Sequence, residues 1–188
     1  MKDLVTKIYQ ESIRVKEDTF KNNTAKIVQA AEVIIKTFEK GGKILFFGNG
    51  GSAADSQHIA AEFIGRFQKE RRALPAIALT TDSSILTALG NDYSFDIVFA
   101  RQIEGLGKKG DLAFGISTSG NSKNVIEGIR KAKTLGLTTL TLTGCDGGQI
   151  GKLGDINIIV PSNVTARIQE SQLCIYHAIC ELVENHFA

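Results

Sequence analysis

Apolar and polar positions form two patterns along the chain. A short, nearly continuous apolar run, typical of a buried parallel strand, lies at residues 43–47, and further strand candidates lie at residues 76–79, 111–117, 138–143 and 156–160. Between them, apolar residues recur at helical spacing around residues 53–67, 83–104, 122–135 and 165–186. This alternation predicts an α/β fold, a three-layer sandwich in which helices cover both faces of a five-stranded parallel sheet.

Two further segments with helical spacing precede the first strand and lie outside the alternation. They cover residues 3–18 and 24–39. We expect these N-terminal helices, within residues 1–40, to cover the sheet or to pack against another subunit, with residues 41–188 forming the α/β core. A length of 188 residues, 43% of them hydrophobic, suits a single domain over residues 1–188.

Charge and composition exclude several kinds of partner. The formal net charge is +2, from 22 basic and 20 acidic residues that are scattered along the chain, so nothing indicates a nucleic-acid groove. No apolar run reaches the roughly 18 residues that span a bilayer, and the first residues lack a signal-peptide core. We therefore expect a soluble, cytoplasmic protein without a membrane partner. Three cysteines without a CxxC pair fit reduced thiols.

A loop rich in hydroxyl groups follows the third predicted strand. Its four hydroxyl side chains belong to Ser117, Thr118, Ser119 and Ser122, just before a helix. A helix N-terminus offers unpaired N–H groups to an anion, and the absence of a Walker lysine or a G-x-G-x-x-G turn disfavours a nucleotide. The loop favours a phosphate monoester on a small metabolite, although an ordinary capped turn would use the same residue types.

Two other turns at the carboxyl ends of predicted strands are chemically marked. The first strand runs into Asn49, Gly50, Gly51 and Ser52, where the glycines permit close approach of a ligand to the backbone. The fourth runs into the glycine-rich segment 144–148. Ligands collect outside the carboxyl ends of such strands, so we expect the site at this edge of the sheet.

His58 and Glu62 stand at positions i and i+4 of the predicted helix 53–67. They share one helix face, about 6 Å apart along the axis. The spacing suits two ligands of a metal ion or a hydrogen-bonded acid–base pair. A solvated surface pair would show the same spacing.

His177 lies in an apolar stretch of the last predicted helix, between Cys174 and Cys180. Apolar surroundings lower the pKa of a histidine and keep its imidazole neutral, able to bind a metal or to transfer protons. The alternative is a core histidine bonded to a backbone carbonyl. The two cysteines have apolar neighbours and are interpreted as structural.

The hydroxyl loop resembles the phosphate-binding loop of the sugar isomerase (SIS) family, and six motifs in order resemble the phosphoheptose isomerases, also called sedoheptulose 7-phosphate isomerases. The motifs are GNGGS at 48–52, HIAAE at 58–62, GND at 90–92, ISTSGNS at 116–122, LTGCDGG at 142–148 and RIQE at 167–170, followed by His177. This resemblance covers nearly the whole chain.

The resemblance implies a flavodoxin-like SIS domain with aldose–ketose isomerase activity. Its members convert sedoheptulose 7-phosphate into D-glycero-D-manno-heptose 7-phosphate through an enediol. This is the first step towards the ADP-heptose or GDP-heptose precursors of lipopolysaccharide, capsule and other surface glycans. It also implies a homotetramer whose active sites are shared between subunits.

The resemblance further implies roles for particular residues. Those matching the acid–base pair are Glu62 and His177. Those matching the ligands of one zinc ion per subunit are His58, Glu62, Gln169 and His177. Those matching substrate contacts are Asn49, Gly50, Gly51, Ser52, Glu62, Arg66, Asn91, Asp92, Ser117, Thr118, Ser119, Ser122 and Gln169. Ala166 stands where some members carry an acidic residue.

The implied zinc ligands raise a geometric question. Gln169 and His177 are eight residues apart, about 12 Å along a straight helix, too far to reach one ion easily. Either the helix is irregular near Gln169, or the two side chains come from different subunits.

A non-enzymatic relative is the main alternative. The DnaA-binding initiator-associating proteins resemble this chain in their sugar-phosphate loops, but lack the residues that match Glu62 and His177. A binding module has no need for a carboxylate and a buried imidazole beside a phosphate site, so the presence of both favours the enzyme.

Overall fold

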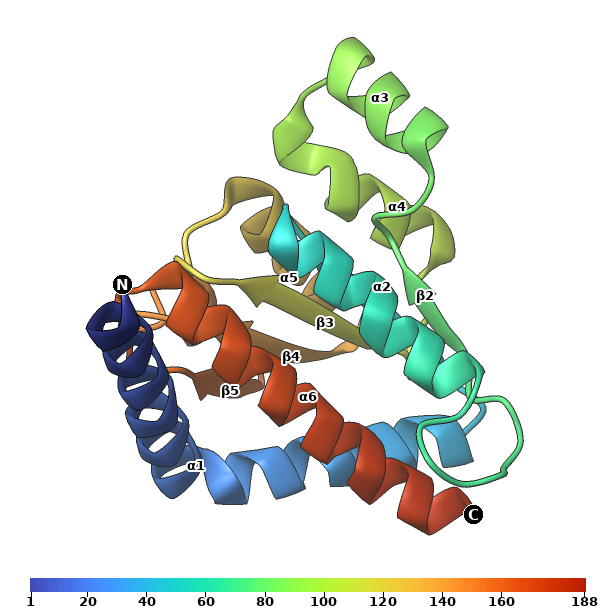
Figure 1. Ribbon diagram of the computed structural model, residues 1–188. Coiled ribbons are helices and arrows are strands. Elements are labelled where there is room, and N and C mark those ends of the chain that lie inside the picture. Colours follow the sequence, from blue (N-terminus) through green and yellow to red (C-terminus); the bar gives the residue numbers. More distant parts are fainter.

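The computed structural model describes residues 1–188 and consists of a parallel five-stranded sheet between two layers of helices (Figure 1). The strands are β1 (Ile44–Gly48), β2 (Ala76–Ala78), β3 (Leu112–Ser117), β4 (Thr138–Thr143) and β5 (Ile156–Ile159). Each predicted strand is confirmed, with its ends shifted by at most one residue. The strand order β2-β1-β3-β4-β5 is flavodoxin-like and places the topological switch point between β1 and β3.

Both faces of the sheet are covered, which explains the nearly continuous apolar run of β1. Ile44 and Phe46 of β1 pack on the side of α1 (Lys2–Glu39), α2 (Gly51–Ile64) and α6 (Thr165–Phe187). The intervening residues of the strand, Leu45 and Phe47, pack on the side of α4 (Val98–Leu106) and α5 (Lys123–Thr134). None of the helices is long and apolar enough to cross a membrane.

The segment before the sheet forms one helix, so the prediction of two N-terminal helices was wrong. The polar residues around position 20 do not interrupt α1, because their side chains bond to the helix itself. Thr19 Oγ1 donates to the carbonyl of Val15 (2.6 Å), and Asn23 Nδ2 to those of Thr19 (2.9 Å) and Ile159 (3.0 Å). Such bonds bend helices, and α1 changes direction between its darker and lighter blue parts (Figure 1).

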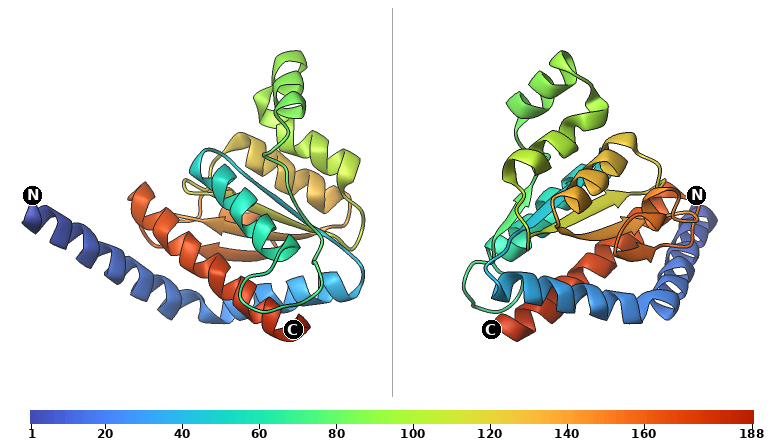
Figure 2. Two further views of the ribbon diagram at one scale, coloured as in Figure 1. Left: turned by 45° about the vertical axis from the view of Figure 1, so that its right-hand side comes forward. Right: turned by 180° about the vertical axis from the view of Figure 1, so that it is seen from behind.

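The helix predicted over 83–104 is interrupted, which is a second correction. It consists of α3 (Ser83–Asp92), a 3₁₀ turn η1 (Phe95–Ile97) and α4. The break is local, because the Ser94 hydroxyl accepts from the amide of Asp96 (3.1 Å) and starts a new turn there. No residue of α3 is buried, and α3 projects beyond α4 and away from the sheet (Figure 2). A second 3₁₀ turn, η2 (Ile150–Lys152), precedes β5.

Candidate active site

Two of the loops that the sequence marks as candidates for ligand binding lie side by side at the topological switch point, and we call them the ligand loops. The glycine loop (residues 48–52) follows β1 and the hydroxyl loop (residues 117–122) follows β3, its neighbour in the sheet. A reciprocal amide pair joins the glycine loop to the first turn of α5, directly after the hydroxyl loop: Asn49 Nδ2 donates to Asn124 Oδ1 (2.8 Å), and Asn124 Nδ2 donates to Asn49 Oδ1 (2.9 Å). Asn124 is buried and was not anticipated from the sequence, since an asparagine in a first helical turn is common there.

The hydroxyl loop is closed on itself and ends at a helix N-terminus. The Ser117 and Ser122 hydroxyl oxygens are 2.9 Å apart, within hydrogen-bond distance. Ser122 is the N-cap of α5, but its side chain makes no capping hydrogen bond. Ser119 Oγ accepts from the amide of Asn121 (3.2 Å). The loop is therefore compact, and the first N–H groups of α5 are available to an anion.

The glycine-rich segment 144–148 braces the hydroxyl loop. Gly120 has φ +66°, and a Cβ built on it would collide with the carbonyl oxygen of Gly147. The amide of Gln149 donates to Asn121 Oδ1 (3.1 Å), and that of Ile150 to the Gly120 carbonyl (2.9 Å). This third marked turn therefore packs against the hydroxyl loop, which is the candidate phosphate-binding loop, and fixes its shape.

Three possible metal ligands converge between α2 and α6. One ligand atom each from His58, Glu62 and His177 lies within 4.8 Å of the other two; we call this set the His–Glu–His cluster. His58 Nε2 is 3.0 Å from Glu62 Oε1, so the predicted pairing along α2 is present. The His58 side chain is 43% exposed and that of Glu62 20% exposed, which leaves the cluster open to a ligand.

The electrostatics of the cluster favour a neutral His177. Burial lowers the pKa of the His177 imidazole below its usual value, and the neighbouring His58 lowers it further, while Glu62 opposes the shift. The apolar neighbours of His177 in the sequence predicted a lowered pKa, and the structure gives a shift in this direction.

The cluster's donor set fits a transition metal such as zinc. Two imidazole nitrogens and one carboxylate oxygen are the three protein ligands of many catalytic zinc sites, with a further position for water or substrate. Gln169, the fourth ligand implied by resemblance, lies elsewhere in this chain. Its amide contacts Gly51 so closely that a Cβ on the glycine would collide with it. Because α6 is one continuous helix across Gln169 and His177, an irregular helix does not explain their separation.

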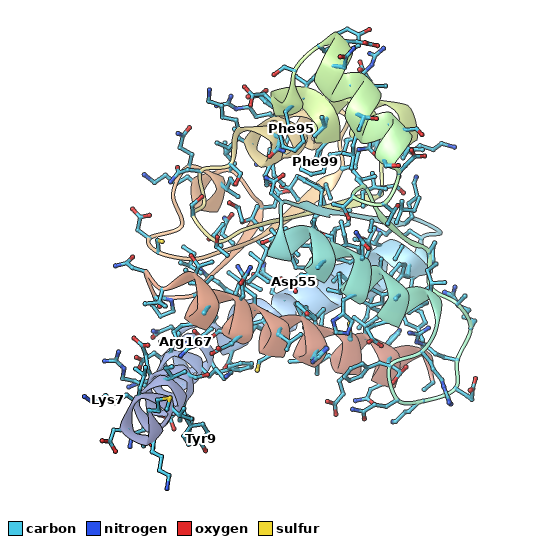
Figure 3. All side chains as sticks on the ribbon, turned by 45° about the horizontal axis from the view of Figure 1, so that its top comes forward. Lys7, Tyr9, Asp55, Phe95, Phe99 and Arg167 are labelled. Atoms are coloured by element: carbon cyan, nitrogen blue, oxygen red, sulfur yellow. The ribbon has the colours of Figure 1, made fainter.

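A buried tyrosine and a half-buried aspartate, neither predicted from the sequence, lie next to His58. The Tyr176 hydroxyl is 3.2 Å from Asp55 Oδ1 and 3.3 Å from His58 Nδ1. Tyr176 is fully buried, and Asp55 of α2 lies between α2 and α6 (Figure 3). Burial raises the pKa of the Asp55 carboxyl, although the Tyr176 hydrogen bond and His58 oppose this. Asp55, His58 and Glu62 share a helix face at i, i+3 and i+7, which was the available signal.

Glu184 on α6 holds the loop that follows α2. It is 2% exposed, and its carboxylate accepts from the amides of Phe67 (2.8 Å), Gln68 (2.6 Å) and Lys69 (2.9 Å). Burial alone would raise the pKa of the Glu184 carboxyl, but these three N–H groups and Arg71 hold it below its usual value. Phe67 in turn packs against His177, with ring centroids 5.4 Å apart.

Arg71 ties the same loop to the end of α2. Its guanidinium donates to the carbonyls of Glu62 (2.7 Å), Phe63 (2.9 Å) and Gly65 (3.2 Å), and its Nε is 3.4 Å from Glu184 Oε1. The carbonyls at the C-terminal end of α2, which have no partner within the helix, are thereby satisfied. The helix that carries His58 and Glu62 is fixed at that end.

Two of the predicted substrate contacts lie on the projecting α3. Asn91 and Asp92 end the projecting α3 and bond to each other, Nδ2 to Oδ1 at 2.8 Å. Arg66 is largely exposed and donates to Glu70 (2.8 Å).

Similarity to known proteins shows which family the chain belongs to. A family model described as SIS domain matches residues 8–144, and the chain belongs to this family. Within it, the full-length relatives are phosphoheptose isomerases. That of Aquifex aeolicus (strain VF5) is 55% identical over 184 residues, covering 98% of this chain and 96% of the relative. That of Campylobacter jejuni subsp. jejuni serotype O:6 is 50% identical over 187 residues, covering 100% of both.

Solved structures agree with the sequence relatives. Phosphoheptose isomerase GmhA from Neisseria gonorrhoeae has a TM-score of 0.92 at 46% identity, covering 98% of both chains. A phosphoheptose isomerase from Francisella tularensis has a TM-score of 0.94 at 36% identity, covering 97% of both.

Proposed function

We propose that this chain is a phosphoheptose isomerase that interconverts sedoheptulose 7-phosphate and D-glycero-D-manno-heptose 7-phosphate. The observation that carries the proposal is the His–Glu–His cluster, which places Glu62 and His177 together from helices far apart in the sequence. The relatives at about half identity bear the name of this activity. The DnaA-binding alternative is not favoured, because its function gives no role to these two side chains.

The ligand loops would bind the end of the substrate that does not react. The hydroxyl groups of the hydroxyl loop and the N-terminus of α5 suit the 7-phosphate. Binding energy from this remote group can place the reacting carbons against the acid–base pair.

The isomerisation needs two proton movements. One proton moves from C1 to C2 of the sugar and another from the C1 oxygen to the C2 oxygen, through an enediol. Glu62, as a carboxylate, can take the proton from C1 and return it to C2. A neutral His177 can accept and donate the proton that moves between the oxygens, which agrees with its lowered pKa.

Zinc is the metal that we propose for the cluster. His58, Glu62 and His177 would hold it, with Gln169 as a further ligand by resemblance. When bound, it would act as a Lewis acid on the sugar oxygens. Glu62 has two carboxylate oxygens, so binding a metal through one leaves the other available as a base.

We further propose a homotetramer with shared active sites. Asn91 and Asp92 project on α3, outside the site of their own chain, and Gln169 is separated from His177 along α6. Exposed apolar side chains on the N-terminal half of α1, among them Leu4, Val5 and Ile8, would be covered in an assembly.

Turnover of sedoheptulose 7-phosphate by the wild type and by Glu62→Gln and His177→Ala tests the function. Loss of a general acid or base lowers the rate about 10² to 10⁴-fold, so both variants should fall by this range while remaining folded. Glu17→Gln and His186→Ala are matched controls, because both side chains are exposed and distant from the cluster. A wild-type protein that is inert on every heptose and hexose phosphate offered would contradict the proposal.

A further inference from the structure

Tyr176 presents one hydroxyl group to two partners that could each accept its proton. Asp55 Oδ1 is 3.2 Å away and His58 Nδ1 is 3.3 Å away. Asp55 has no other donor: its second oxygen, Oδ2, is buried without a hydrogen-bond partner. The direction of the Tyr176 proton therefore decides which tautomer of His58 is favoured.

Counting protons selects one arrangement when Asp55 is ionised. An ionised Asp55 can only accept, and a phenol has a single proton to give. If Tyr176 donates to Asp55, its oxygen is left to accept from Nδ1–H of His58. The proton of a neutral His58 is then on Nδ1. Nε2 lies 3.0 Å from Glu62 Oε1 and would carry the proton if it donated to an ionised Glu62, but in this arrangement it offers its lone pair to a metal ion where the possible ligand atoms converge.

We propose that Asp55 and Tyr176 are positioning residues that fix the Nδ1–H tautomer of His58 and so present Nε2 as a metal ligand. This inference rests on the proposed metal site. Partners behind a ligating histidine fix its tautomer and ring orientation, and their loss typically weakens metal binding 10 to 100-fold. Tyr176 and Asp55 touch neither substrate nor metal, so they act only through His58.

We call the hydrogen-bonded series Asp55–Tyr176–His58 the relay. It predicts that the effects of two substitutions on zinc affinity are not additive. Tyr176→Phe keeps the buried ring but leaves Nδ1 without a partner, which should weaken zinc binding about 10 to 100-fold. Asp55→Ala should weaken it at least as much, because Tyr176 is then free to donate to Nδ1 and the His58 proton moves to Nε2. The zinc affinity of the double variant should recover to that of Tyr176→Phe, because the double variant lacks the Tyr176 hydroxyl that would donate to Nδ1 of His58.

Zinc dissociation constants are measured on the purified proteins by competition with a chromophoric chelator. Tyr9→Phe and Asp18→Ala are the matched controls, since both side chains are exposed on α1 and should leave the constant unchanged. Asp55→Leu, which also has no acceptor oxygen but fills more of the space, replaces Asp55→Ala if the alanine variant does not fold. The chain has three histidines, so long-range ¹⁵N–¹H spectra of the zinc-loaded protein can show whether His58 carries its proton on Nδ1.

The results separate the relay from the proposed function. Additive losses in the double variant would indicate a purely structural role and overturn the relay, as would unchanged zinc affinity in both single variants or a wild type that binds no zinc. Turnover of sedoheptulose 7-phosphate is measured on the same samples. An inert wild type that still shows the predicted order of affinities counts against the isomerase function and leaves the relay intact.

Discussion

The carbonyl oxygen of Gly147 lies where a side chain on Gly120 would have to be. Gly120→Ala should therefore shift the hydroxyl loop and lower kcat/KM for the sugar phosphate about 10 to 100-fold, because small displacements of a positioning loop are costly. Steady-state kinetics test this. Gly110→Ala is the control, since Gly110 also has a positive φ (+96°) but nothing within 4 Å of an added Cβ. It should lose about 1–2 kcal/mol of stability and keep its kcat/KM. Equal kinetic losses in both variants would contradict the bracing role.

Spacing along the chain predicted some residues of the site and could not predict others. His58 and Glu62 were found because an i, i+4 pair on one helix is visible in the sequence. Tyr176 was missed because a buried tyrosine next to apolar residues looks like core, and its polar role depends on Asp55, which is brought to it only by the packing of α2 on α6. Contacts between distant elements leave no local pattern.

At the scale of elements, the loop after α2 depends on one buried carboxylate. Glu184→Gln should lower the free energy of unfolding by about 3 kcal/mol at pH 7, because a buried charge partner of three N–H groups and Arg71 is lost. The folded-state pKa of Glu184 is depressed, so its stabilisation is present above the ordinary value of 4.5 and is lost as the pH falls through the folded-state pKa. The difference between variant and wild type should shrink below pH 4.5.

Denaturant unfolding at pH 7 and at several pH values from 4.5 downward, at one protein concentration, measures this difference. Glu181→Gln, exposed on the same helix, is the control and should change stability by no more than about 0.5 kcal/mol. A pH-independent loss in Glu184→Gln would show that shape, and not charge, is what Glu184 contributes.

Whole elements were predicted best where they are buried on both sides. All five strands were predicted, β1 from its nearly continuous apolar run and β4 although four of its six residues are threonine, a β-branched residue that favours strands. The wrong predictions concerned helices with polar residues, which can either end a helix or bond to its backbone. Thr19 and Asn23 resemble a break in α1 but bond to its carbonyls, whereas Ser94 lies within a helical pattern and starts a new turn.

On the scale of the whole molecule, shared active sites predict complementation between inactive chains. Gln169→Ala and His177→Ala should each be nearly inactive alone. If each site takes these residues from different subunits, mixed assemblies contain some intact sites and should recover roughly a quarter of the wild-type activity after random mixing. Unfolding and refolding the two variants together, against each refolded alone, measures it. Activity no greater than the sum of the two parents would place both residues of each site in one chain.

The position of Glu184 also determines how far the chain could be shortened. Ends of domains usually tolerate deletion unless their backbone is tied down. Here the last turn of α6 holds a loop 117 positions earlier, and through Phe67 it reaches His177. Trimming residues 184–188 would therefore affect the surroundings of His177, whereas a tag placed before the exposed start of α1 adds to a segment that extends away from the sheet (Figure 2). For expression and crystallisation, the two ends of this chain are not equivalent.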